Sequence, residues 1–254
     1  MSKKGISVCM FSAKGGVGKT TNILNLAGII SQLEKKVLII DFDLYSGCIA
    51  NYLNRRFDKD IIHLNDDLVN NRYKNIRDYV TNYQTGIDIL CAPIDPRKAS
   101  SMDVRSIPDI ISMGCLEYDV VLIDTNHALD AINLTILENV DQIYFMTSGD
   151  PMDLSNIRSL LTIFDDLKFN NYKIIVNHSR DPYKNYLDTF EIKKILGHNI
   201  DYHLSEELFL KDMDKYVMEG TVMSLDKSFS SVMAKDYRTF VVMATDLLGE
   251  NNHE

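Results

Sequence analysis

The sequence predicts an α/β fold, a single doubly wound domain in which helices cover both faces of a mostly parallel β-sheet. Three observations predict it. Runs of consecutive apolar residues recur along the chain, as in strands that are buried on both faces. Segments with apolar residues at helical spacing lie between these runs. No internal repeat, low-complexity segment or Pro/Gly/Ser-rich linker interrupts the 254 residues, so we expect one domain over 1–254.

The apolar runs are the predicted strands of this sheet. The first, GISVCMF, ends in a glycine-rich stretch, and the second and fourth end in aspartate. Unbroken apolar runs, rather than alternating ones, favour parallel strands with helices on both sides. The strands are expected at residues 5–11, 36–41, 86–93, 118–124, 141–148 and 172–177.

The predicted helices fill the intervals between the strands. The first, over 21–34, repeats Ile, Leu and Ala at helical spacing. Residues 54–86 are polar and are expected to be irregular, with one or two short helices. Because a membrane-anchoring helix needs a basic polar face and the chain ends in TDLLGENNHE, we expect the last helix to pack on the sheet. The other helices are expected at 103–114, 128–138, 153–169 and 230–250.

Composition and charge narrow the classes of function. The net charge of −9 opposes non-specific nucleic-acid binding, which needs a basic surface, so DNA is not an expected partner. No apolar run reaches the ~18 residues of a membrane span, and the apolar N-terminal run is too short for a signal peptide, so we expect a cytoplasmic protein with no integral membrane segment. The widely spaced cysteines lack paired CxxC spacing and are expected to be small buried hydrophobes: Cys9, Cys48, Cys91 and Cys115.

The stretch SAKGGVGKTT, residues 12–21, predicts a phosphate-binding loop between the first strand and the first helix. Its glycines let backbone N–H groups converge on phosphate oxygens at a helix N-terminus. Lys19 is expected to contact the β- and γ-phosphates, and the Thr20 hydroxyl to ligate Mg²⁺. The pattern is a variant of GxxxxGK[ST], because Ala13 stands where the first glycine is expected. The nucleotide-binding residues expected here are Gly15, Gly16, Val17, Gly18, Lys19, Thr20 and Thr21.

Polar side chains end three of the other predicted strands. VLIIDFDLYSG places Asp41 and Asp43 after the second strand, and YDVVLIDT places Asp124 after the fourth. Carboxylates at the C-terminal ends of parallel strands, beside a phosphate loop, are well placed to hold a metal ion and water. Asn177 follows the sixth strand, where its amide could pair with the N6/N7 edge of adenine, although asparagine is also a common turn residue.

KGGVGKTT resembles the deviant Walker A motif of the ParA/MinD family of ATPases, which have a P-loop NTPase fold. This resemblance covers nearly the whole chain and implies ATP and Mg²⁺ as ligands and an ATP-sandwich homodimer. Lys14 matches the signature lysine, which reaches the partner's nucleotide and makes hydrolysis depend on dimerisation. The resemblance further implies that Asp41 and Asp124 contact Mg²⁺-bound waters and that Asp43 orients or deprotonates the attacking water. The expected catalytic residues are Lys14, Lys19 and Asp43, with Asn177 on the purine edge.

Segments outside the phosphate site resemble the TadZ/CpaE branch of that family, whose members localise the secretion machinery of Tad-type pili. They are DTNHALD (124–130), in place of DTPP, LCAPIDPRKAS (90–100) and DFDLYSGCIANYL (41–53). This resemblance implies a slowly hydrolysing switch that positions a partner complex and is recruited by partners to the cell pole or membrane. Many members carry an N-terminal receiver-like domain, which we do not expect here because the first strand begins at Gly5. YHLSEE (202–207) departs from the proline-containing segment that relatives have beside the base.

Other functions stay open beside this one. A nucleotide-binding scaffold with a constitutive dimer and negligible turnover is one, although Lys14, Asp43 and Asp124 favour the switch. A ParA-like DNA or plasmid partition ATPase is another, opposed by the acidic charge. A MinD-type amphipathic tail, the cysteines of nitrogenase-like iron proteins after Cys115 and the tyrosine cluster of bacterial tyrosine kinases are all missing. His127, a lone loop histidine, is assigned no role.

Overall fold

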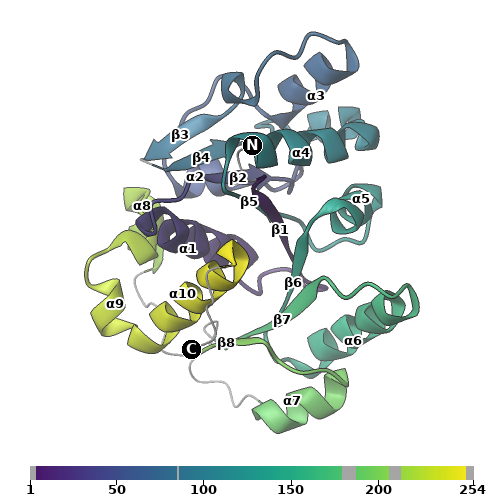
Figure 1. Ribbon diagram of the computed structural model, residues 1–254, viewed down its shortest axis with the longest axis vertical. Helices are drawn as coiled ribbons and strands as arrows, with labels where there is room; N and C mark the ends of the chain where they lie inside the picture. Colours follow the sequence, from purple (N-terminus) through teal and green to yellow (C-terminus); the bar gives the residue numbers. More distant parts are fainter. Residues whose placement is uncertain (1–3, 85, 179–186, 206–212, 250–254) are drawn as a thin grey trace.

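An eight-stranded, mostly parallel β-sheet forms the centre of the computed structural model, which describes residues 4–84, 86–178, 187–205 and 213–249 (Figure 1). The strand order is β3-β4-β2-β5-β1-β6-β7-β8, and every neighbouring pair is parallel except β3 and β4. The predicted fold class is therefore confirmed. The strands are β1 (Ile6–Phe11), β2 (Val37–Asp41), β3 (Thr81–Gln84), β4 (Ile87–Leu90), β5 (Val120–Asp124), β6 (Gln142–Thr147), β7 (Tyr172–Asn177) and β8 (Tyr202–Leu204).

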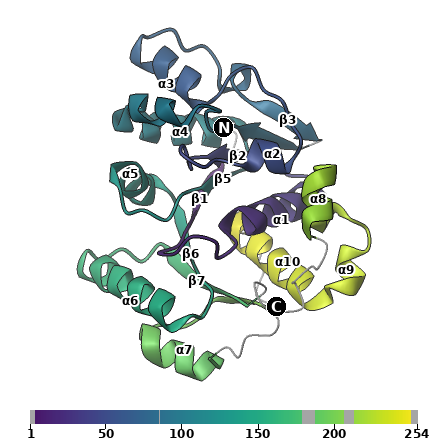
Figure 2. The same cartoon turned by 180° about the vertical axis from the view of Figure 1, so that it is seen from behind.

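Helices lie on both faces of the sheet, as Figures 1 and 2 show from opposite sides. One face carries α1, α9 and α10, and the other carries α3 to α7. Successive residues of β1 alternate between the faces, so that Cys9 and Phe11 belong to one apolar cluster and Val8 and Met10 to the other. The helices are α1 (Lys19–Gln32), α2 (Ile49–Tyr52), α3 (Ile61–Val69), α4 (Ile107–Glu117), α5 (Ala131–Asn139), α6 (Pro151–Asp166), α7 (Thr189–Leu196), α8 (Met213–Glu219), α9 (Phe229–Val232) and α10 (Ala234–Leu248).

Register brings the ends of the central strands to one edge of the sheet. β1 pairs with β5 so that Met10 lies opposite Asp124, and β2 pairs with β5 so that Asp41 lies opposite Asp124. The loops that follow these strands therefore begin side by side. This edge holds the phosphate-loop motif and both predicted carboxylate motifs.

Two edge strands were not predicted from the sequence. β3 and β8 lie at opposite ends of the sheet, and β3 falls in the stretch 54–86 that was expected to be irregular. The residues of β3, TNYQ, are mostly polar and only partly buried, because an edge strand has one side open to solvent. A search for unbroken apolar runs finds buried central strands and misses such edges.

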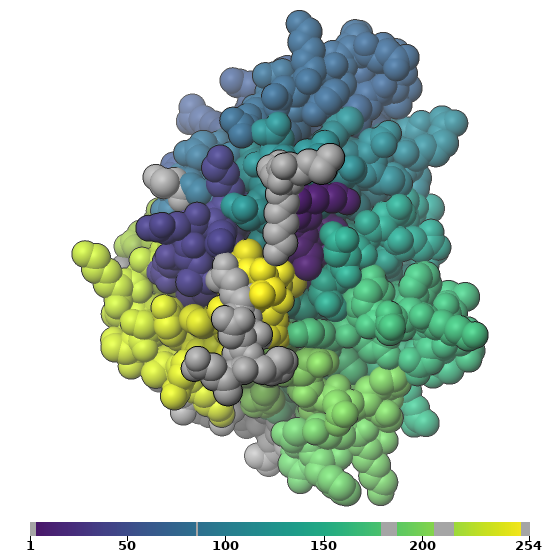
Figure 3. All heavy atoms as spheres, viewed as in Figure 1, coloured from purple at the N-terminus to yellow at the C-terminus, as the bar shows by residue number. Residues whose placement is uncertain are grey.

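The closing helix packs on the sheet, as expected, but it is two helices rather than one. α9 ends at Val232 and α10 begins at Ala234, because Met233 between them has φ −115° and ψ 42°, outside the helical region. Phe240, Met243 and Ala244 are buried, and α10 lies against α1, where the atoms of the two helices adjoin in Figure 3. Residue 250 of the predicted helix, and 206–207 of YHLSEE, lie outside the described residues.

Helix starts follow local rules. The helix predicted at 103–114 begins only at Ile107, because Pro108 occupies its first turn and a 3-10 turn precedes it.

Three of the four cysteines are buried as expected, and Cys48 is half-buried. No helix in the described part of the chain combines the length and the apolar character needed to cross a membrane.

Candidate nucleotide and magnesium site

The loop between β1 and α1 is shaped to bind an anion. Gly16 (φ 74°) and Gly18 (φ 99°) adopt the left-handed conformation that glycine tolerates best. Gly18 is the N-cap of α1 and supplies no side-chain hydrogen bond to it, whereas Asp60, Asp150 and Asp188 cap α3, α6 and α7. The first turn of α1 thus keeps backbone donors for a ligand, at the positive end of the helix dipole.

Lys19 places a buried cation beneath this loop. Its side chain is largely buried, and Nζ donates a hydrogen bond of 2.8 Å to Ser12 Oγ, which in turn donates to the Lys14 carbonyl at 2.8 Å. Burial lowers the pKa of Lys19, and the charge of Asp124 opposes that shift. An ammonium group held in this way gains most from a bound anion, because an anion offsets its desolvation.

Asp124 and Asp41 lie together at the ends of β5 and β2, and both are almost fully buried. Thr20 Oγ1 donates to Asp124 Oδ2 at 2.5 Å, while Asp124 Oδ1 has no hydrogen-bond partner among the described residues. Asp41 accepts from the amides of Asp43 (3.2 Å) and Ile49 (3.3 Å). Burial raises the pKa of Asp124 to about 6, and burial together with the charge of Asp124 raises the pKa of Asp41. Both shifts disfavour the ionised carboxylates, so a cation bound nearby would stabilise their charged forms.

The donor set fits Mg²⁺. It consists of a threonine hydroxyl and two carboxylates beside an anion-binding loop, and hard oxygen donors are the ligands that Mg²⁺ prefers. Within the described ranges, no group of three or more His, Cys, Asp or Glu side chains could hold a metal by itself. Mg²⁺ usually keeps several waters and is held by one or two carboxylates and the phosphates of its nucleotide.

Lys14 and Asp43 flank this centre. Lys14 is exposed, and it forms no ion pair within the described part of the chain, so its ammonium group is accessible to another molecule. Asp43 is half-buried, accepts a 3.1 Å hydrogen bond from the Ser46 amide, and contributes its charge to the environment of both Lys19 and Asp124. The structure therefore brings Asp43 to the centre and leaves Lys14 at its rim.

Asn177 is tied to the phosphate loop, which the sequence did not indicate. Its side chain is buried at the end of β7, and Nδ2 donates to the Val17 carbonyl at 2.8 Å. A Cβ atom at Gly18 would lie 2.7 Å from the same nitrogen, so glycine is needed there for a second reason. The purine contact expected of Asn177 stays a prediction, beside a clear role in holding the loop.

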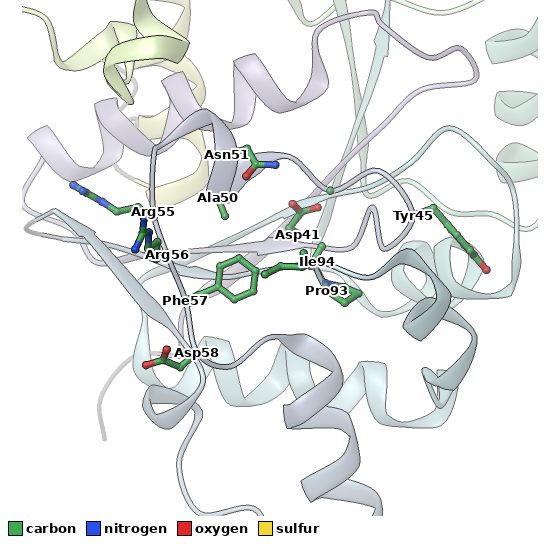
Figure 4. A pocket seen from close by; sticks show the side chains of 12 residues that line it. Asp41, Tyr45, Ala50, Asn51, Arg55, Arg56, Phe57, Asp58, Pro93 and Ile94 are labelled. Atoms are coloured by element: carbon green, nitrogen blue, oxygen red, sulfur yellow. The ribbon is translucent and has the colours of Figure 1, made fainter.

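A cavity of about 470 Å³ opens beside Asp41 (Figure 4). Asp41 forms part of its lining, together with the apolar side chains of Phe57 and Ile94. Gly47 brings the two surrounding loops close, since a Cβ atom there would lie 2.3 Å from Ala92 Cβ and 2.8 Å from Asp41 Oδ2. Asp41 thus lines this cavity and is paired with Asp124 in the neighbouring strand.

The loop after β5 brings His127, to which the sequence pattern assigns no role, to the phosphate loop. His127 lies next to Gly15, with its Nδ1 atom 3.4 Å from the position that a Cβ atom on Gly15 would take. These residues are far apart in the chain, and DTNHALD contains no spacing that points to the phosphate loop. The feature of the sequence that could have pointed to His127 is its position in the loop that follows Asp124, the predicted metal-site aspartate.

Comparison with known proteins places this geometry in context. The family model described as AAA domain matches residues 5–176. An uncharacterized ATP-binding protein of Methanocaldococcus jannaschii is 28% identical over 143 residues, which cover 56% of this chain and 53% of the relative. The chain spans about half the length of the curated relatives that it matches first.

Solved structures share the fold. A ParA family ATPase from Chlorobium tepidum has a TM-score of 0.79 at 22% identity, over 94% of this chain and 98% of that chain. The septum site-determining protein MinD from Pyrococcus horikoshii, complexed with Mg-ADP, has a TM-score of 0.77 at 17% identity, over 96% of each chain. The likeness extends over nearly the whole sheet and its helices.

Proposed function

This chain belongs to the AAA domain family; from this premise we propose that it is an ATPase of the ParA/MinD type, which binds ATP with Mg²⁺ and hydrolyses ATP slowly, as a dimerisation switch. One observation carries the proposal. The uncapped helix α1 begins at Lys19, whose buried ammonium bonds Ser12 of the same loop, and its first turn supplies the Thr20 hydroxyl that bonds Asp124. Phosphates fit the helix N-terminus and the lysine, and a hard cation fits the hydroxyl and carboxylate oxygens.

In the proposed site, the backbone of residues 15–21 surrounds the phosphates and Lys19 contacts the β- and γ-phosphates. Thr20 would hold Mg²⁺ directly, and Asp41 and Asp124 would hold it through water. Bound Mg²⁺ would supply charge neutralisation on the phosphates. Asp43, half-buried beside this centre, orients a water molecule for in-line attack on the γ-phosphate, which leaves ADP and phosphate.

The loop is proposed to be the deviant Walker A form, and Lys14 to act in a second subunit. Its side chain is exposed and forms no ion pair among the described residues, so it can reach a nucleotide bound by a partner copy. A cation brought in by the partner makes hydrolysis depend on dimerisation, because it neutralises charge that develops on the transferring phosphoryl group.

The switch is proposed to position a partner complex, as in the TadZ/CpaE branch that DTNHALD and the segments 41–53 and 90–100 resemble. Partners, rather than a span of its own, would bring the chain to the cell pole or membrane. The net charge of −9 favours a protein partner over DNA. Salt-sensitive binding to arbitrary duplex DNA would instead support a partition function.

The test is the molar mass in solution, measured by light scattering with Mg-ADP and with Mg-ATP. We expect the mass to double only with ATP in the wild type, and to stay monomeric in Lys14→Ala. Lys227→Ala, which removes an exposed lysine far along the chain, is the matched control and should behave as the wild type. A molar mass that is the same with ADP and with ATP would favour the constitutive scaffold and would contradict the switch.

A further inference from the structure

We propose that His127 contacts the γ-phosphate of the bound nucleotide, so that a single subunit distinguishes ATP from ADP before any dimer forms. The inference rests on the proposed nucleotide site and adds to it a residue that acts within its own subunit. It is distinct from Lys14, whose proposed role is in the partner.

The γ-phosphate end of the loop can be located from Lys19. The lysine of such a loop reaches the β- and γ-phosphates, whereas the helix N-terminus surrounds the other end of the phosphate chain. Here the Lys19 ammonium bonds Ser12 Oγ, and Ser12 bonds the Lys14 carbonyl. The segment from Ser12 to Gly15 is therefore the side on which the γ-phosphate lies.

His127 lies close to this segment, beside Gly15. A Cβ atom built on Gly15 would meet three atoms of the imidazole ring, Nδ1 at 3.4 Å, Cε1 at 3.6 Å and Cγ at 3.9 Å. These distances are ordinary van der Waals contacts, so a methyl group on Gly15 would just fill the space between the glycine and the imidazole ring. Because Gly15 has no side chain, none stands between the loop backbone and the ring nitrogen.

The backbone around His127 is held on both sides by hydrogen bonds. Asn126 Oδ1 accepts from the Ala128 amide at 2.7 Å and from Asn133 Nδ2 at 2.7 Å, and Asn133 Nδ2 also donates to the Ala128 carbonyl at 2.6 Å. Asn133 is fully buried at the start of α5, where its own amide donates to the N-cap Asp130. Fixed neighbours hold the exposed His127 beside the loop.

An imidazole N–H is a suitable donor for a phosphate oxygen, and ADP lacks the oxygens of the γ-phosphate. The same loop begins at Asp124, which holds Thr20. A γ-phosphate contact at His127 would therefore be transmitted directly to the segment that holds the proposed metal site. This couples the recognition of ATP to the geometry needed for its hydrolysis.

The experiment compares the affinities for Mg–AMP-PNP and Mg-ADP by titration calorimetry, in the full-length Lys14→Ala chain to remove dimerisation. His127→Ala should weaken AMP-PNP binding about tenfold and change ADP binding less than about twofold. His127→Gln, which keeps an N–H donor, should recover most of the difference. Leu129→Ala, an exposed residue of the same loop, is the control and should bind both nucleotides as the parent does.

Two negative outcomes are distinct. If His127→Ala weakens both nucleotides equally, or neither, His127 does not contact the γ-phosphate and the inference is overturned while the proposed function stands. If the parent chain binds neither nucleotide, the proposed function fails and the inference fails with it. The thermal unfolding of the ligand-free variants shows whether the fold is intact, and the Gln variant repeats the test with less structural change.

Discussion

Asn177 shows how a single side chain can serve the phosphate site from a distant strand. It stands at the end of β7, yet its amide donates to the Val17 carbonyl in the phosphate loop. Losing this bond would leave a carbonyl in a buried place without its donor, which costs about 1–3 kcal/mol. The residue thus links the sheet to the loop independently of any contact with the base.

Replacing Asn177 with alanine tests these two roles. If the residue holds the loop, Asn177→Ala should weaken Mg-ATP and inorganic tripolyphosphate by a similar factor, about tenfold. Tripolyphosphate has no base, so it reports the loop alone; calorimetric titration of both ligands is the measurement. Weaker ATP binding with unchanged tripolyphosphate binding would show instead that Asn177 recognises the purine.

At the scale of one element, α1 begins differently from three helices on the other face of the sheet. α3, α6 and α7 begin with an aspartate whose side chain accepts from their first turn, and α1 begins with Gly18 in the left-handed conformation. A side-chain cap would compete with a ligand for the same amides. The uncapped start of α1 leaves these amides open to a ligand, at a cost in the stability of the ligand-free helix.

Gly18 and Gly15 offer a matched pair of substitutions in this loop. Gly18→Ala should destabilise the ligand-free protein by about 1–2 kcal/mol, because φ is 99° and the new Cβ would lie 2.7 Å from Asn177 Nδ2. Gly15→Ala should leave that stability nearly unchanged, since its nearest contact is an ordinary 3.4 Å from His127. Urea unfolding of both variants is the measurement, and equal losses would contradict the strain at Gly18.

The whole molecule combines three loops from neighbouring strands into one centre. The loops after β1, β2 and β5 contribute Lys19 with Thr20, Asp41 with Asp43, and Asp124. Since β1, β2 and β5 are adjacent and parallel, their C-terminal ends lie at the same edge of the sheet. A switch between monomer and dimer would be governed from this edge, where Lys14 is exposed.

Asp43→Ala should separate nucleotide binding from hydrolysis. Loss of the residue that orients water should slow turnover by at least about a hundredfold, while the groups that bind the phosphates remain. In a light-scattering time course after ATP addition, the variant should therefore keep the molar mass of a dimer. The wild type should return to the monomer mass as ADP forms. If ATP fails to dimerise Asp43→Ala although it binds, the role assigned to Asp43 is wrong.

Patterns within short stretches predicted the central strands and most of the site. The apolar runs indicated β1, β2, β4, β5, β6 and β7, and the motifs around them predicted the phosphate loop and the carboxylates. These features depend on neighbours in the chain, because periodicity and strand-end residues are local properties. Edge strands such as β3 were not predicted, because their partly exposed residues do not form an unbroken apolar run.

By itself, the sequence determined the α/β class and predicted the anion-binding loop and the residue types that suit Mg²⁺ and ATP. Only the tertiary structure decided which side chains meet: Asp41 opposite Asp124, Asn177 on the Val17 carbonyl, and His127 beside Gly15. The physical reason is that these pairs are separated by long stretches of chain. Their contact follows from strand order and register, which the packing of the whole sheet sets and no local pattern encodes.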